Sequence, residues 1–191
     1  MTDDTNYQIP GHNQVSLTDE LANEIREHFA RDRDNRFRLF LIAAGLRNRY
    51  LDKKTKSYVK EFDTWYRREK FQDYFGTLAN FTKYASAGDV VAYISKTYGD
   101  ETSKFLKQIP TSVGAMYEAS QILTHDNDLM NLCLRFTVKR TSVDQPKDQW
   151  VSKKPALLNP HATEAQIRTW RRNWLNPPPP RQKRTDKRTL L

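Results

Sequence analysis

Apolar side chains recur every three to four positions along most of the chain, which predicts a mainly helical protein. Leu17, Leu21, Ile25 and Phe29 follow one another at four-residue spacing, the pattern of an amphipathic helix with one face on a core. Residues 35–50 are apolar on most sides, which favours a buried central helix. We therefore expect a mainly α fold.

Residues that begin or end helices divide this pattern into elements. Gly88-Asp89 interrupts the spacing, and Gly99 stands where a helix would end. Residues 135–143 are rich in β-branched side chains, which favours a short strand or hairpin arm. Side chains that can cap a helix N-terminus are Ser16 or Thr18, Thr111 or Ser112, Asp126 or Asn127, and Thr163.

Three regions follow from the pattern. Residues 1–15 are polar and predict a flexible arm. Residues 16–176 hold the periodic segments and predict one helical domain, in which the polar, proline-containing residues 144–160 form an extended connection. Residues 177–191 begin with four prolines, which favour a stiff spacer, and continue as a basic tail that we expect to be disordered.

Positive charge is concentrated near the end of the chain. The net charge is +9 over 191 residues, and residues 166–191 hold eight bases and one acid, a net charge of +7. Residues 1–165 therefore carry only +2. A surplus of this kind favours a polyanionic partner, because each base that neutralises a phosphate releases counterions.

Residues 58–84 combine nine aromatic side chains with interleaved lysine and arginine residues. The four phenylalanines of this stretch are expected in the core. Tyr66, Tyr74 and Tyr84 are expected at the surface, because a hydroxyl group tolerates water. Bases of a single strand stack on exposed rings for about 1–3 kcal/mol each, whereas duplex bases are already stacked. This stretch therefore favours single-stranded DNA.

The candidate nucleic-acid-binding residues share a positive charge or an expected exposed ring. They are Lys56, Lys60, Tyr66, Arg67, Arg68, Lys70, Tyr74, Lys83, Tyr84, Arg168, Arg171, Arg172, Arg181, Lys183, Arg184, Lys187 and Arg188.

Catalytic chemistry is not indicated. The four histidines have no metal-site spacing, and the sequence contains neither a phosphate loop nor a nucleophile elbow. Cys133 has apolar neighbours and is expected in the core. We therefore expect a protein that is not an enzyme, with no cofactor and no metal.

Membrane insertion and secretion are not indicated either. No stretch approaches 18 apolar residues, and the acidic, polar start of the chain differs from a secretory signal. The expected location is the cytoplasm.

Three segments resemble small helical proteins of bacterial phages and plasmids that act in replication, partition or transcription. They are residues 62–65 (Phe-Asp-Thr-Trp), residues 109–118 (Ile-Pro-Thr-Ser-Val-Gly-Ala-Met-Tyr-Glu) and residues 159–164 (Asn-Pro-His-Ala-Thr-Glu). Residues 109–118 are similar to a Leu-Pro-x-Ser segment of those proteins, which is followed by a helix that contains Leu-Tyr-Glu. In size and character the chain is also similar to single-stranded-DNA-binding cofactors of the RNA polymerases of short-tailed lytic phages.

This resemblance implies binding at melted promoters and recruitment of a phage-encoded RNA polymerase or replication protein, in the cytoplasm of the bacterial host. A homo-oligomer fits the same picture. Two alternatives remain. One is a double-stranded-DNA regulator with a helix-turn-helix in residues 71–94, with Gly76 or Gly88 near the turn. The other is a protein-interaction adaptor that uses the proline segment.

Overall fold

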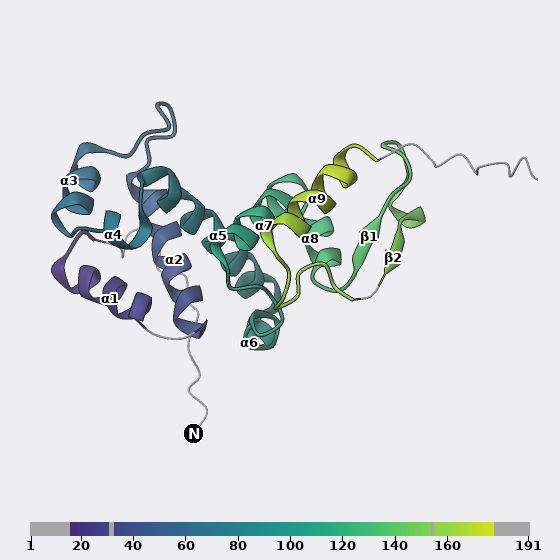
Figure 1. Cartoon of the computed structure of the whole chain (residues 1–191), viewed down its shortest axis with the longest axis horizontal. Coiled ribbons are helices and arrows are strands. Elements are labelled where there is room, and N and C mark those ends of the chain that lie inside the picture. Colours follow the sequence, from purple (N-terminus) through teal and green to yellow (C-terminus); the bar gives the residue numbers. More distant parts are fainter. Residues whose placement is uncertain (1–15, 31–32, 154, 178–191) are drawn as a thin grey trace, which may run out of the picture.

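The computed structural model describes residues 16–30, 33–153 and 155–177 and confirms a mainly helical fold (Figure 1). In Figure 1 the molecule is elongated, with α1–α4 at one end, α7–α9 and two strands at the other, and α5 between them. The described residues form nine α-helices: α1 (Asp19–Ala30), α2 (Arg33–Tyr50), α3 (Lys60–Arg68), α4 (Gln72–Phe75), α5 (Leu78–Tyr98), α6 (Thr102–Leu106), α7 (Val113–His125), α8 (Asn127–Cys133) and α9 (Glu164–Leu175).

Helices α2 and α5 pack against each other at the centre of the molecule. The prediction that residues 35–50 form a buried helix is confirmed, since Phe40 and Leu41 are fully buried. Gly88 lies inside α5, so the helix break predicted at this position is wrong. A Cβ atom at Gly88 would lie 2.1 Å from the Phe40 carbonyl oxygen and 2.7 Å from the Ala44 Cβ atom. Glycine therefore serves here for the close approach of two helices.

Two hydrophobic cores share these central helices. The N-terminal core joins α1, α3 and α4 to one part of α2 and α5, and it includes Ile25, Leu46, Phe62, Trp65, Tyr66, Phe71, Phe75 and Phe81. The C-terminal core joins α6–α9 to the other part, and it includes Phe40, Val91, Ile94, Met116, Ile122, Leu129, Ile167 and Trp174. Because α2 and α5 contribute to both cores, the two halves depend on the same helix pair.

Local capping predictions are confirmed at several helix starts. Thr18 Oγ1 accepts a hydrogen bond from Leu21 N, and Ser112 Oγ accepts one from Ala115 N. Asp126 caps α8, and Thr163 forms a reciprocal capping box with Gln166. Each cap satisfies backbone N–H groups that have no partner within the helix.

A short hairpin covers the far end of the C-terminal core. Strands β1 (Thr137–Lys139) and β2 (Val151–Lys153) pair antiparallel. Strand β1 falls within the predicted range 135–143, whereas β2 lies in residues 144–160, which were expected to be only an extended connection. The indole N–H of Trp170 donates to the Val138 carbonyl oxygen at 2.7 Å, so the hairpin and α9 are held together.

The aromatic stretch at residues 58–84 is broken into three helices, although its spacing indicated one continuing pattern. Lys70 has φ 55° between α3 and α4, and Gly76 has φ 75° between α4 and α5. These left-handed residues reverse the direction of the backbone. The rings of the three helices therefore converge on one core instead of lying on all sides of one helix.

Candidate nucleic-acid interface

The connection between α2 and α3 holds the densest group of positive charges in the described part of the chain. Residues 49–60, here called the basic turn, contain five bases and one acid, Asp52. Lys53, Lys54, Lys56 and Lys60 are all exposed. In Figure 1 this segment stands out from the helices at the α3 end of the molecule. A projecting turn of this charge can approach a phosphate backbone without steric conflict.

Backbone hydrogen bonds give the basic turn a defined shape. Leu51 and Tyr58 form an isolated antiparallel bridge, and Val59 N donates to the Tyr50 carbonyl oxygen at 2.9 Å. The Asp52 carboxylate accepts from Lys54 N at 2.7 Å, and this bond lowers the pKa of Asp52. The acid is thus held by backbone groups while the lysine side chains face water. A preformed turn loses less conformational entropy when it binds.

A shallow groove of about 400 Å³ continues from the basic turn along α3. Lys60, Thr64 and Arg68 lie on one stripe of the helix, four residues apart, and line this groove together with Leu17, Glu61 and Trp65. Trp65 is 4% exposed, and its indole N–H has no hydrogen-bond partner among the described residues. The structure thereby brings together two predicted bases, Lys60 and Arg68.

The other predicted basic residues at this end of the molecule differ in whether an acidic side chain neutralises their charge. Arg67 pairs with Asp63 at 3.1 Å, and Arg68 contacts Asp19 and Glu69. Lys70 is exposed. Sequence reasoning missed Lys53 and Lys54, which lie beside the predicted Lys56. Their signal was the charge run itself, in residues 52–57, whose basic and polar composition predicted only a connection between helices.

The prediction that Tyr66 lies at the surface is wrong. Tyr66 is 3% exposed, and its hydroxyl donates to the Gly76 carbonyl oxygen at 3.0 Å. Burial raises the pKa of Tyr66. The hydroxyl group has found a backbone partner, so it no longer needs water. Tyr66 offers no face on which a base could stack.

The other two tyrosines differ from each other. Tyr84 is half-buried, and its ring lies 4.8 Å from Phe75 and 5.9 Å from Phe40, so the surface position expected for it is only partly realised. Tyr74 is 40% exposed and rests on Phe29, with ring centroids 5.2 Å apart. Of the three tyrosines, Tyr74 alone keeps the exposure that stacking requires.

Two of the arginines on α9, Arg168 and Arg171, pair with a buried glutamate. Glu118 of α7 is 2% exposed as a residue and accepts hydrogen bonds from Arg168 Nε at 2.8 Å and from Arg171 Nη2 at 2.9 Å. Arg168 also pairs with Glu164 on its own helix. Arg168 and Arg171 therefore hold α9 against α7, which corrects the expectation that their charge is directed at phosphate. Arg172 is exposed.

The remaining predicted residues lie apart from these groups. Lys83 is exposed on α5, with its amine 5.9 Å from the Tyr117 ring. Arg181, Lys183, Arg184, Lys187 and Arg188 lie outside the described residues. The predicted site is thus distributed between the two ends of the molecule, with its clearest concentration at the basic turn.

The Glu118 ion pairs lead to a prediction about pH. Burial raises the pKa of Glu118, but the hydrogen bonds from Arg168 and Arg171 outweigh burial and place this pKa below its usual value. A lowered folded-state pKa adds stability above the unfolded value near ~4.5, and this stability is lost as the pH falls through the folded value. We expect Glu118→Gln to lower the free energy of unfolding by about 1–3 kcal/mol at neutral pH.

Urea denaturation at neutral and at acidic pH measures this effect. The difference between Glu118→Gln and the unchanged protein should shrink below about pH 4. Glu101→Gln is the matched control, because Glu101 is exposed and lies 3.9 Å from Lys104. An equal difference at both pH values would show that the charge of Glu118 is not what stabilises the contact.

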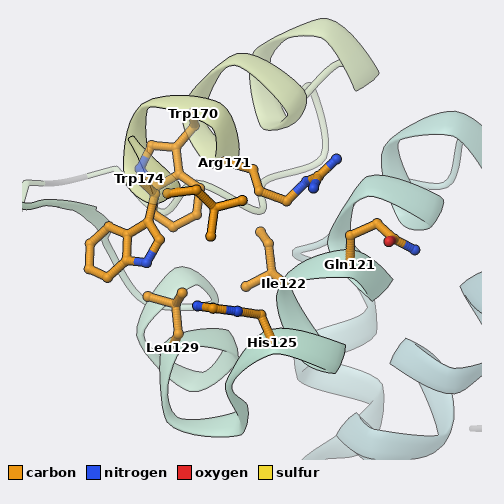
Figure 2. A pocket seen from close by; sticks show the side chains of 8 residues that line it. Gln121, Ile122, His125, Leu129, Trp170, Arg171 and Trp174 are labelled. Atoms are coloured by element: carbon orange, nitrogen blue, oxygen red, sulfur yellow. The ribbon is translucent and has the colours of Figure 1, made fainter. Parts of the chain in front are cut away.

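A second concave feature lies between α7, α8 and α9. This cavity of about 110 Å³, here called the α7–α9 pocket, is lined by Gln121, Ile122, His125, Leu129, Trp170, Arg171, Trp174 and Leu175. The rings of Trp170 and Trp174 are stacked with centroids 5.3 Å apart. Figure 2 shows the two indoles on one side of the pocket, with His125 across from them. Arg171 was predicted here as a nucleic-acid-binding residue, but the pocket was not predicted.

The described helices do not support the helix-turn-helix alternative at residues 71–94. Helix α4 has only four residues, and α5 is buried on several sides at Phe81, Ala85, Val90 and Val91. A recognition helix has to present one face to the major groove. Gly76 lies at a turn, as expected, whereas Gly88 does not.

Other kinds of site are missing from the part of the chain that the structure describes. In these residues no three His, Cys, Asp or Glu side chains gather as a metal ion would require. Cys133 is buried, and burial raises the pKa of its thiol. Among the described helices, none combines the length and the apolar character needed to cross a bilayer.

Comparison with known proteins adds no relative from which a role could be transferred. The charge, the exposure and the contacts of the residues above are therefore the features that bear on function. No family model, no curated protein and no solved structure matches this chain.

Proposed function

We propose that this protein binds nucleic acid, with a preference for single-stranded DNA, and that it is not an enzyme. The observation that carries the proposal is the basic turn, in which Lys53, Lys54, Lys56 and Lys60 are exposed on a hydrogen-bonded projection. No ion pair is found for these four lysines among the described residues, whereas Arg67, Arg68, Arg168 and Arg171 all face acids. Their charge is thus available to phosphate groups.

The groove along α3 extends this surface. Lys60 lies at the junction of the basic turn and the groove, and Thr64 and Arg68 follow on the same stripe. A strand that crosses the turn can continue along α3 with its phosphates near these side chains. Contacts of this kind give affinity without sequence preference, because the phosphate backbone is the same for every sequence.

The preference for single strands rests on fewer residues than the sequence indicated. Tyr66 is buried, but Tyr74 remains 40% exposed at the same end of the molecule. An exposed ring can stack on an unpaired base and finds no free base face in a duplex. As in the phage and plasmid proteins that the chain resembles, the bound form would act in bacterial transcription or replication beside a polymerase or replication protein.

Competition binding tests this proposal. Labelled oligo(dT) bound to the full chain is challenged with unlabelled oligo(dT), duplex DNA and RNA of equal length. We expect oligo(dT) to compete best, and the logarithm of its affinity to fall with the logarithm of salt concentration with a slope at least as steep as about −3, because the four lysines of the basic turn alone contribute about −0.7 each. Absence of binding at low salt would refute nucleic-acid binding, and stronger competition by the duplex would refute the strand preference.

A further inference from the structure

The α7–α9 pocket has walls suited to a flat ring. On one side Trp170 and Trp174 stack on each other with an interplanar angle of 20°, and Trp150 meets Trp174 edge-on at 4.2 Å. The indole N–H of Trp170 is held by the Val138 carbonyl oxygen at 2.7 Å. The orientation of the aromatic wall is therefore set by the hairpin and by its own stacking, before any ligand arrives.

The opposite side of the pocket is polar and accessible. His125 is the last residue of α7 and is exposed, and Gln121 lies one turn earlier and is half-buried. Figure 2 shows the His125 imidazole across the pocket from the tryptophan rings, with Ile122 and Leu129 between the two sides. Imidazole and carboxamide groups can each donate or accept a hydrogen bond. The pocket thus combines ring faces with groups that could hydrogen-bond the edge of a base.

Arg171 adds a cation whose position is fixed. Its Nε and Nη2 atoms donate to Glu118 at 3.2 Å and 2.9 Å, so the guanidinium group cannot swing freely. Its Nη1 atom makes no hydrogen bond with the described residues. A fixed guanidinium group at a pocket lined by rings suits a ligand that carries both a flat ring and acceptor oxygens.

The size of the pocket limits what can enter. Sites for drug-sized molecules span about 300–1,000 Å³, and a cavity of about 150 Å³ accommodates a benzene ring. The α7–α9 pocket measures about 110 Å³. The pocket is smaller than that benzene-sized cavity, so one six-membered ring can enter it only in part, with its remaining edge at the opening, and a fused purine bicycle would protrude further.

We propose that the α7–α9 pocket receives one unpaired pyrimidine base of a bound strand. The inference rests on the proposed function and names the group of the nucleic acid that this end of the molecule would bind. Trp174 is 4% exposed, and the Arg140 guanidinium lies 4.9 Å from its ring centroid. The base would therefore stack against the half-buried Trp170 and present its carbonyl and N–H edge to His125 and Gln121.

The test compares strands that differ only in their bases. Anisotropy titrations of the full chain use oligo(dT), oligo(dA) and an abasic oligomer of equal length at about 50 mM salt. Oligo(dT) should bind at least about fivefold more tightly than the abasic oligomer, since one stacked base contributes about 1 kcal/mol or more. It should also bind more tightly than oligo(dA), and it should quench tryptophan fluorescence.

Two variants test whether the α7–α9 pocket causes the tighter binding of oligo(dT). His125→Ala removes one wall, and Gln121→Phe places a ring at the entrance; each should abolish the advantage of oligo(dT) and leave the affinity for the abasic oligomer unchanged. His161→Ala is the matched control, because His161 is exposed and does not line the pocket. The unchanged abasic affinity also shows that the variants are folded.

Each contrary result has a separate meaning. Equal affinities for oligo(dT) and the abasic oligomer would overturn the base pocket and leave backbone binding intact. An advantage of oligo(dT) that survives both variants would also overturn it, because the base would then be bound elsewhere. Equal binding of oligo(dA) and oligo(dT) would contradict the pyrimidine assignment. If none of the oligomers binds, the proposed function fails and the pocket inference fails with it.

Discussion

Replacing Lys53, Lys54 and Lys56 together with alanine should weaken the binding of single-stranded DNA by about threefold to a hundredfold at low salt. The three side chains are exposed on the basic turn, and the backbone bonds that shape the turn do not involve them. An exposed charge contact contributes about 0.2–1 kcal/mol, and about 1.4 kcal/mol corresponds to tenfold in affinity. Three lost contacts should also reduce the salt slope on a single strand by about 2.

A matched variant distinguishes the effect of where the lysines lie from the effect of the net charge of the protein. Replacing Lys96, Lys104 and Lys139 with alanine removes the same charge from exposed sites on α5, α6 and β1. We expect this variant to bind with nearly unchanged affinity and salt slope. Titrations of both variants over a range of salt concentrations decide the question. An equal loss in both would show that the general field of the protein, and not the basic turn, attracts the strand.

Gly88→Ala should destabilise the protein by about 3 kcal/mol or more. The new methyl group would lie 2.1 Å from the Phe40 carbonyl oxygen, and a backbone atom cannot rotate away as a side chain can. Overpacking typically costs about 1–3 kcal/mol, and more when the backbone has to move. Because α2 and α5 belong to both cores, separating them should loosen the whole molecule, which urea or thermal denaturation measures.

Gly114→Ala is the control for this substitution. The three atoms nearest to a Cβ atom at Gly114 all belong to the Glu164 side chain, with Oε2 at 2.0 Å, and this carboxylate lies at the end of a flexible chain. Alanine also favours a helix by about 1 kcal/mol relative to glycine. We expect a change within about 1 kcal/mol. If both alanine variants have the stability of the unchanged protein, the helix crossing tolerates a wider separation than its geometry indicates.

The helices and their starts could be predicted from the sequence because the forces that form them are local. The spacing of apolar residues predicts α2, and Ser112, Asp126 and Thr163 each cap a helix as expected. A capping side chain and the N–H group it satisfies lie within three residues of each other. Such contacts can be predicted from residues that are close together in the sequence, and the mainly α fold follows from them.

Exposure within the aromatic stretch could not be predicted in this way. Tyr66 and Tyr74 have the same side chain in the same kind of surroundings, yet one is buried and the other is 40% exposed. Positive φ angles at Lys70 and Gly76 redirect the chain between the helices. Beyond these turns the predictions are confirmed for the buried Phe71, Phe75 and Phe81 and for the exposed Tyr74. Tyr66 lies before them in α3, and its hydroxyl meets the Gly76 carbonyl oxygen only because the chain turns back.

The helical elements, their capped starts and the excess of positive charge are local or compositional features, so they follow from the order of the residues alone. Which charges remain exposed and which rings remain accessible depends on contacts between residues far apart in the chain. Arg168 and Arg171 were counted as candidates for phosphate until α9 was seen to pack against Glu118, about fifty positions earlier in the chain. Gly88 resembled a helix break until α2 was found beside it. Partners distant in sequence meet only when the chain has folded, and no local pattern encodes them.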